Sequence, residues 1–114
     1  MKRKNCCPIA QALGVLGDKW SLIVLRDVIF GKKRHFNDLL ASPEKISTNI
    51  LSNRLKTLQQ ESLLCCSVDL ENRRSKIYTP TEKAQDLVPV LVELYKWGEK
   101  YNDRADTAEN PLQE

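Results

Sequence analysis

Hydrophobic residues recur along most of this chain with the three- to four-residue spacing of helices. Pro8 suits the first turn of a helix, where its missing N–H costs nothing, and that helix ends near Gly17. Asp18 is a suitable N-cap for a second helix, whose apolar side chains point almost all round between residues 20 and 30. Such a helix belongs at the centre of a domain. Gly31 then offers a left-handed C-cap.

Two further helices follow, and the second of them is polar along one side. The first is short, about 36–41, and stops at Ser42-Pro43, because the residue before proline avoids helical geometry. Ser47 can cap the second, which reaches about Glu61 and carries one leucine stripe: Leu51, Leu55 and Leu58. Another face offers only hydrogen-bonding groups and one lysine: Thr48, Asn49, Ser52, Asn53, Lys56, Gln59 and Gln60. A merely solvated helix usually mixes both charges, so the lack of carboxylates on this face is unusual.

The pattern then changes to the two-residue period of strands. Three apolar residues alternate with polar ones here: Cys66, Val68 and Leu70. A second strand is expected over 76–79, and the polar residues 71–75 connect the two. We therefore predict a β-hairpin with Arg73 and Arg74 at its tip.

A last helix, about 81–102, begins at Thr79 or Thr81 and is kinked near 85–89 by Pro89. It carries one apolar stripe of Leu87, Val90, Leu91, Leu94, Trp97 and Tyr101, and beside it a second of Val88, Val92 and Tyr95. One small core cannot cover both stripes, so we predict that the second forms a dimer interface with an identical chain.

Length and composition favour one domain with a modest core. The chain has 114 residues, of which 41% are hydrophobic and 29% charged, so it is neither disordered nor membrane-spanning. We predict a single domain over 1–104 and a loose tail over 105–114. Residues 1–4 lead into no signal sequence, which places the protein in the cytoplasm with no membrane partner. No cofactor motif is found, and we expect no enzyme.

Charge is divided unevenly along the chain. Residues 1–80 carry fourteen basic and seven acidic side chains, whereas residues 81–114 carry four and eight. A basic body with an acidic C-terminal part suits a protein that meets a polyanion with one region. The alternative is an ordinary uneven surface.

The order of helices and hairpin is that of a winged helix-turn-helix, a mainly α fold with a small β-hairpin wing. A DNA major groove about 12 Å wide admits one helix whose side chains reach base edges, while a wing reaches phosphates or the minor groove. The predicted DNA contacts are Ser47, Thr48, Asn49, Ser52, Asn53, Arg54, Lys56, Arg73, Arg74 and Lys76. Alternatively, the polar helix is simply solvated and the arginines keep a sheet edge soluble. A winged-helix module that binds a protein partner through its last helix is a second functional alternative.

The four cysteines form two adjacent pairs, Cys6-Cys7 and Cys65-Cys66. Neither pair has the two-residue spacer of zinc ligands, and the one histidine, His35, has no ligand-like spacing to them, so we expect no metal and no cofactor. Adjacent cysteines form strained disulfides, which argues against a small redox enzyme. Reduced thiols are expected.

Over Cys7 to Gly98 the sequence resembles the HxlR family of bacterial winged-helix transcriptional regulators, relatives of the MarR group. The matching residues are Cys7-Pro8, Leu16-Gly17-Asp18-Lys19-Trp20, Arg34, Phe36, Leu39, Ile46-Ser47, Leu51, Leu55, Leu58, Tyr78, Thr81, Leu87, Pro89 and Trp97-Gly98. The resemblance implies a homodimer, joined mainly through terminal helices, that binds palindromic operator DNA. Three residues depart from the family: Ser62 and Ala84 replace usual glycines, and Pro80 replaces a common leucine.

The cysteine before proline has an implied function of its own, since some family members use it to sense quinones, aldehydes or oxidants. In this chain it is Cys7, at a helix N-cap and close in sequence to Lys2, Arg3 and Lys4. A helix N-terminus and nearby cations stabilise a reactive thiolate. The resemblance thus implies Cys7, with Cys6 beside it, as a redox-sensing residue for an unknown inducer. The alternative is an inert, partly buried thiol.

Overall fold

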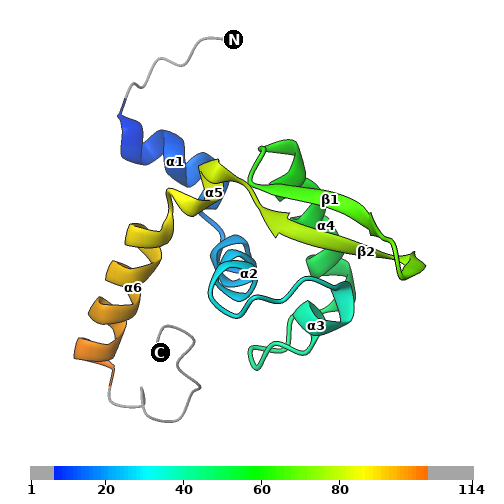
Figure 1. Ribbon diagram of the computed structural model, residues 1–114. Coiled ribbons are helices and arrows are strands. Elements are labelled where there is room, and N and C mark those ends of the chain that lie inside the picture. Colours follow the sequence, from blue (N-terminus) through cyan, green and yellow to red (C-terminus); the bar gives the residue numbers. More distant parts are fainter. Residues whose placement is uncertain (1–6, 103–114) are drawn as a thin grey trace.

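The computed structural model describes residues 7–102, which form six helices and one antiparallel hairpin (Figure 1). The elements are α1 (Pro8–Leu16), α2 (Lys19–Ile29), α3 (Phe36–Leu40), α4 (Thr48–Gln60), β1 (Leu64–Asp69), β2 (Asn72–Pro80), α5 (Glu82–Gln85) and α6 (Val88–Tyr101). This order confirms the mainly α fold with a hairpin wing. The hairpin projects to one side of the helices, and α6 lies on the opposite side (Figure 1).

Helix α2 occupies the centre, as its apolar pattern predicts. Asp18 caps it, because one carboxylate oxygen accepts hydrogen bonds from the backbone N–H of Trp20 at 2.7 Å and of Ser21 at 3.3 Å. Val24, Leu25 and Val28 are buried. Most other elements of the fold pack around this helix.

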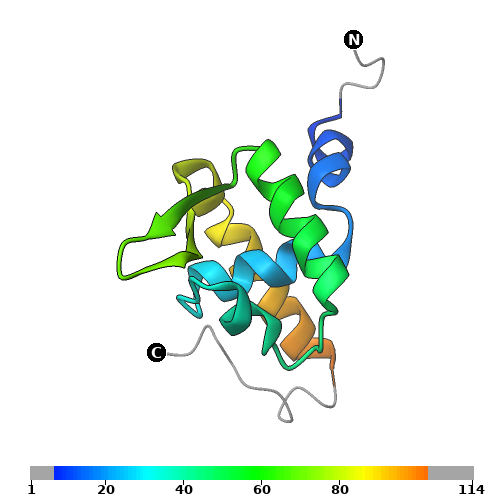
Figure 2. The ribbon, with the colours of Figure 1, turned by 90° about the vertical axis from the view of Figure 1, so that its right-hand side faces the viewer.

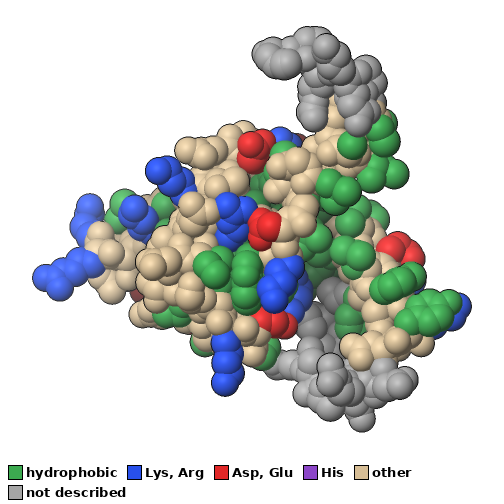
Figure 3. Space-filling model, turned by 180° about the vertical axis from the view of Figure 1, so that it is seen from behind, with side chains coloured by type: hydrophobic (Ala, Val, Ile, Leu, Met, Phe, Trp, Pro, Cys, Tyr) green, Lys and Arg blue, Asp and Glu red, His purple; other side chains and the backbone are tan. Residues whose placement is uncertain are grey.

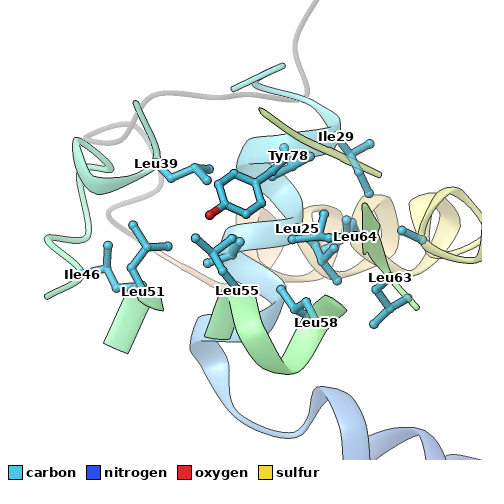
Figure 4. Packing of buried hydrophobic residues seen from close by; sticks show 14 residues of the cluster. Leu25, Ile29, Leu39, Ile46, Leu51, Leu55, Leu58, Leu63, Leu64 and Tyr78 are labelled. Atoms are coloured by element: carbon cyan, nitrogen blue, oxygen red, sulfur yellow. The ribbon is translucent and has the colours of Figure 1, made fainter. Parts of the chain in front are cut away.

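A single hydrophobic core joins α2 to α4 and to the base of the hairpin (Figure 4). It contains Val24, Leu25, Val28, Ile29, Leu39, Ile46, Leu51, Leu55, Leu58, Leu63, Leu64, Tyr78, Ala84 and Leu91. The leucine stripe of α4 lies in this core, so the opposite face of α4 is turned outward. Burial of that stripe therefore decides which side chains of α4 reach solvent.

The prediction of a left-handed C-cap at Gly31 is wrong. Lys32 has the positive φ, 54°, whereas no glycine among the described residues has one. Gly31 lies so close to the end of α2 that an added Cβ would stand 2.8 Å from the carbonyl oxygen of Asp27. The glycine is therefore needed for close approach and not for left-handed geometry.

Helix α4 ends in a Schellman motif with Ser62 at the left-handed position. The N–H of Leu63 donates to the carbonyl of Leu58 at 2.8 Å, and the N–H of Ser62 donates to that of Gln59 at 3.0 Å. Ser62 has φ 64°, a conformation in which glycine is free of strain. Ser62 therefore adopts a conformation for which glycine is better suited, as the resemblance implies for this position.

The prediction that Arg73 and Arg74 lie at the tip of the hairpin is wrong. The turn consists of Leu70 and Glu71, and β2 already begins at Asn72. Asp69 pairs with Asn72, but Val68 pairs with Lys76, so the strand contains a bulge that holds Arg73 and Arg74. The predicted strand began four residues too late because the arginines and their neighbours have no apolar alternation.

The last helix of the prediction is two helices in the structure. Thr81 caps α5, since its hydroxyl accepts a hydrogen bond from the N–H of Ala84 at 3.2 Å. The chain then turns at Asp86-Leu87, and Pro89 lies in the first turn of α6, where proline is tolerated. The predicted interruption is therefore present, and it is a complete break.

The apolar stripe of α6 that faces solvent differs from the predicted one. Val88 packs against the core, and Val92 and Tyr95 are half-buried. The exposed side chains are Val90 (44%), Leu94 (49%), Trp97 (67%) and Tyr101 (64%). Any partner of α6 would thus meet mainly the stripe that the sequence pattern assigned to the core.

Two negative predictions concern only the part of the chain that the structure describes. Within residues 7–102, no helix is long and apolar enough to cross a membrane. In that same stretch no three His, Cys, Asp or Glu side chains gather as metal ligands would. The predicted tail over 105–114 and Cys6 lie outside the described residues.

Candidate nucleic-acid interface

The outward face of α4 presents the hydrogen-bonding groups that the sequence predicts for it. Ser47 caps the helix, its hydroxyl accepting a hydrogen bond from the N–H of Ile50 at 3.2 Å. The exposed polar side chains are Thr48, Asn49, Ser52, Asn53, Lys56 and Gln60. Gln59 is half-buried and donates back to the carbonyl of Leu55 at 3.1 Å. We call the six exposed residues the polar face of α4.

Arg54, which is predicted to contact DNA, forms an ion pair with Asp18 within the same chain. Its guanidinium donates to the Asp18 carboxylate at 2.6 Å and to the Ser21 hydroxyl at 3.3 Å. Partial burial raises the pKa of Asp18, but hydrogen bonds from Ser21 and Trp20 and the charge of Arg54 outweigh it, so the pKa is below its ordinary value. Arg54 thereby fixes α4 to the start of α2.

A second ion-pair network fixes the turn before α4. Arg26 donates to both oxygens of Glu44 at 2.8 Å and to Asp27 at 2.8 and 2.9 Å. The hydrogen bond from Arg26 lowers the pKa of Glu44 to about 2, against the opposing effect of burial, and the Ser42 hydroxyl adds to the lowering. Glu44 lies between α3 and α4, so this network sets the geometry of the helix-turn-helix. No sequence motif indicated it, because its residues come from separate elements.

The hairpin carries its basic groups on exposed positions next to the turn. Arg73, Arg74 and Lys76 are all exposed. The side chain of Asn72 accepts a hydrogen bond from the backbone N–H of Arg74 at 3.2 Å, which orders the bulge. The tip itself carries Leu70, an exposed apolar side chain. The arginines thus project from the flank of the wing.

The polar face of α4 and the hairpin lie on the same side of the molecule. In the view from that side, α4 crosses the front uncovered and the hairpin extends beside it (Figure 2). Seen from behind the view of Figure 1, Lys and Arg side chains surround the hairpin end, while hydrophobic side chains gather at the other end, over α1 and α6 (Figure 3). The exposed apolar residues there include Ile9 and Leu13 of α1. One side of the molecule therefore suits a polyanion and the other an apolar partner.

The described cysteines occupy three different environments. Cys7 is exposed and is the N-cap residue of α1, as predicted, although its side chain makes no capping hydrogen bond. Cys65 is exposed on β1, and Cys66 is half-buried against the core beside Tyr78. Burial, together with the neighbouring Cys66, raises the pKa of Tyr78. Cys7 is thus the accessible thiol at a helix N-terminus.

Comparison with family models finds one match that covers most of the chain. The model described as HxlR-like helix-turn-helix matches residues 15–106. This range includes α2, α3, α4, the hairpin and α6.

Individual relatives and solved structures agree with that match. YdeP of Bacillus subtilis, an uncharacterised HTH-type transcriptional regulator, is 35% identical over 103 residues, which cover 90% of this chain and 80% of YdeP. The HTH-type transcriptional regulator YodB of Bacillus subtilis is 30% identical over 107 residues, covering 94% of this chain and 95% of YodB. The oxidised form of the redox regulator HypR has a TM-score of 0.74 at 26% identity, covering 85% of this chain and 99% of that one.

Proposed function

The chain belongs to the HxlR-like helix-turn-helix family and is a DNA-binding transcriptional regulator, and on that premise we propose that it binds an operator of two-fold symmetry as a homodimer. One observation carries the proposal: α4 presents an exposed polar face without a carboxylate beside a wing whose exposed residues include three basic ones. Two copies related by a two-fold axis would present two such faces to one duplex.

Each group has a chemistry suited to one part of the duplex. Asn49 can bond adenine through both groups of its amide. The amide oxygen of Asn53 accepts hydrogen bonds from Arg54, so Asn53 offers DNA its amide N–H groups, while Ser47, Thr48 and Ser52 reach bases or phosphates. Lys56, Arg73, Arg74 and Lys76 can neutralise phosphates, and the arginines can also enter the minor groove. Arg54 is already held by Asp18, so we propose that it orients α4 within the complex.

The dimer interface is proposed on the apolar side of the molecule. Val90, Leu94, Trp97 and Tyr101 form an exposed stripe on α6, and the rings of Trp97 and Tyr101 pack in a tilted arrangement with their centroids 5.6 Å apart. Contiguous exposed apolar surface of this kind marks a partner site. Val88, Val92 and Tyr95, the predicted interface residues, border the stripe and would lie at its edge.

Selection of duplexes from a randomised pool tests the proposal. We expect the protein to enrich a sequence with two inverted half-sites about one helical turn apart, because two recognition helices of one dimer enter successive major grooves. We call the enriched DNA the selected duplex. Its affinity should exceed that of a random duplex by about a thousandfold or more. Fluorescence anisotropy in a fixed salt concentration measures both.

The double variant Arg73→Ala/Arg74→Ala provides the matched test of the wing. Removal of two phosphate contacts should reduce the slope of log affinity against log salt by about 1.8. Enrichment of no sequence would contradict sequence-specific binding, and enrichment of an isolated half-site would contradict the symmetric dimer. An unchanged salt slope in the double variant would exclude the arginines from the interface.

We further propose that oxidation of Cys7 regulates DNA binding. YodB has been solved in a reduced form and in diamide-treated and quinone-bound forms, and HypR as a redox regulator in oxidised and reduced forms. Cys7 of this chain is exposed at the start of α1, a helix on the apolar side proposed for the dimer. Oxidation of Cys7 would therefore change the arrangement of two subunits and the spacing of their recognition helices.

The variant Cys7→Ser tests whether the response to oxidants depends on Cys7 or on one of the other three cysteines. Diamide should lower the affinity of the parent protein for the selected duplex about tenfold, whereas Cys7→Ser should keep its affinity. Serine is itself a good N-cap, so the variant retains α1. Equal loss of binding in both proteins would exclude Cys7 as the sensor and direct attention to Cys65 and Cys66.

A further inference from the structure

A small polar hollow lies between the start of α3 and strand β2, outside the polar face of α4. It measures about 290 Å³ and is lined by His35, Phe36, Asn37, Arg74, Ser75, Lys76 and Tyr78. The lining brings together residues about forty positions apart in the sequence. Figure 2 shows the segment before α3 running beside the hairpin, which is where these residues meet.

Two contacts hold the walls of this hollow together. The backbone N–H of Tyr78 donates to the carbonyl of Arg34 at 2.8 Å, so the segment before α3 lies along β2. The imidazole Nε2 of His35 lies 3.1 Å from a carboxylate oxygen of Asp69 at the end of β1. The other oxygen of Asp69 accepts the backbone N–H of Glu71 at 2.9 Å. One carboxylate thus joins the turn of the wing to the start of α3.

The chemistry of the lining suits an oxyanion. Arg74 and Lys76 are cationic, and Asn37 and Ser75 add hydrogen-bond donors. No carboxylate is among the residues that line the hollow. Its volume is below that of typical small-molecule pockets but ample for one tetrahedral phosphate group.

We propose that this hollow is a phosphate seat, in which Asn37, Arg74 and Lys76 bind one backbone phosphate of the duplex, while His35 positions the start of α3 beside the wing through its contacts with Asp69 and Asp38. The assignment rests on the proposed function, because α3 and the wing are both elements that a helix-turn-helix brings to DNA. It adds two residues, His35 and Asn37, that belong neither to the polar face of α4 nor to the basic flank of the wing. It also gives the wing a fixed distance from α3 in the complex.

His35 is placed to fix the shape of the phosphate seat. Its Nε2 lies 3.1 Å from the Asp69 carboxylate at the end of β1, and its Nδ1 lies 3.6 Å from the Asp38 carboxylate in α3. His35 therefore joins the start of α3 to the wing, and Asn37, Arg74 and Lys76 are the lining side chains that can reach the anion.

The experiment measures the affinity for the selected duplex in wild type and Asn37→Ala at one fixed pH. Asn37→Ala should weaken binding about threefold, because it removes a hydrogen-bond donor from the phosphate seat. Lys76→Ala should reduce the salt slope by about 0.9, whereas Lys96→Ala on α6 should leave it unchanged.

The outcomes separate this inference from the proposed function. Selective binding by wild type with unchanged affinity in Asn37→Ala would overturn the phosphate seat and leave the proposed regulator function intact. If wild type selects no duplex, the proposed function itself fails. Inorganic phosphate tests the alternative that the seat binds a free phosphate anion and not a phosphate of DNA. If it raises the melting temperature of wild type but not of Lys76→Ala, and the variants bind DNA normally, the seat serves a free anion and the DNA assignment is wrong.

Discussion

Replacing Asn49 by alanine should lower the affinity for the selected duplex about tenfold to a hundredfold. An asparagine amide that bonds one base in two directions contributes about 1–3 kcal/mol of discrimination between bases. Asn49 is exposed in the first turn of α4, the part of a recognition helix that reaches base edges. Affinity for a random duplex should change less than about twofold, because phosphate contacts supply that binding.

Gln85→Ala is the matched control for this prediction. Gln85 is an exposed amide on α5, outside the polar face of α4 and the wing. It should bind both duplexes as wild type does. Equal weakening of both duplexes by Asn49→Ala would show that Asn49 contacts the backbone and carries no sequence information. Unchanged binding to both would remove Asn49 from the interface.

The elements of this fold were predictable where local chemistry and tertiary packing agree. Asp18 and Ser47 cap helices where the sequence placed them, and Thr81 is the one of the two candidate threonines that caps α5. Each side chain accepts a hydrogen bond from a backbone N–H within the first turn of its helix. Helix α2 has apolar residues almost all round and lies at the centre of the core. Such features need no information from distant residues.

The errors arose where distant parts of the chain decide the outcome. The arginine segment lacks alternation, yet it belongs to β2 because strand β1 and the segment before α3 supply its partners. On α6 the helical period of the sequence predicts two apolar stripes, but it does not indicate which of them faces the core. The break before α6 and the packing of Val88 and Leu91 on the core turned the other stripe outward.

The candidate site also has a part that the sequence predicts and a part that only the fold reveals. The polar face of α4 was readable because helical period and leucine stripe together orient it. Arg54 could not be distinguished from its neighbours by sequence, since its partner Asp18 is 36 positions away. The phosphate seat was also invisible for this reason. Residue type indicates what a side chain can bind, whereas its partners in the fold decide whether it is available.

The Arg26 network shows how a partly buried ion pair can control a surface site. Asp27 is only 5% exposed, so its carboxylate depends on Arg26 and on Lys33, whose Nζ is 3.8 Å away. Hydrogen bonds from Arg26 to Glu44 connect this buried carboxylate to the turn before α4. They also raise the pKa of Arg26 above its ordinary value. The orientation of the polar face thus depends on charges about twenty residues away.

Arg26→Met should lower the free energy of unfolding by about 2–4 kcal/mol at pH 7. Methionine preserves the aliphatic part of the side chain but leaves the Asp27 carboxylate buried with one distant cation, which is the costly way to break such a pair. Urea unfolding measures the change. Lys96→Met is the matched control, because Lys96 pairs with Glu93 at 3.9 Å on the exposed surface of α6 and should change stability by about 0.5 kcal/mol or less.

The stability of the protein at acid pH provides an independent test of the same ion-pair network. The pKa of Glu44 is about 2 in the folded protein and 4.5 in an isolated side chain, so its contribution is complete above pH 4.5 and is lost as pH falls toward 2. Because the carboxylate is 34% exposed, we expect a loss of about 1–2 kcal/mol and not the full value of the shift. Glu44→Gln should be less stable than wild type at pH 7 and should approach it at pH 3. A constant difference between the two proteins from pH 7 to pH 3 would show that Glu44 is not stabilised by Arg26.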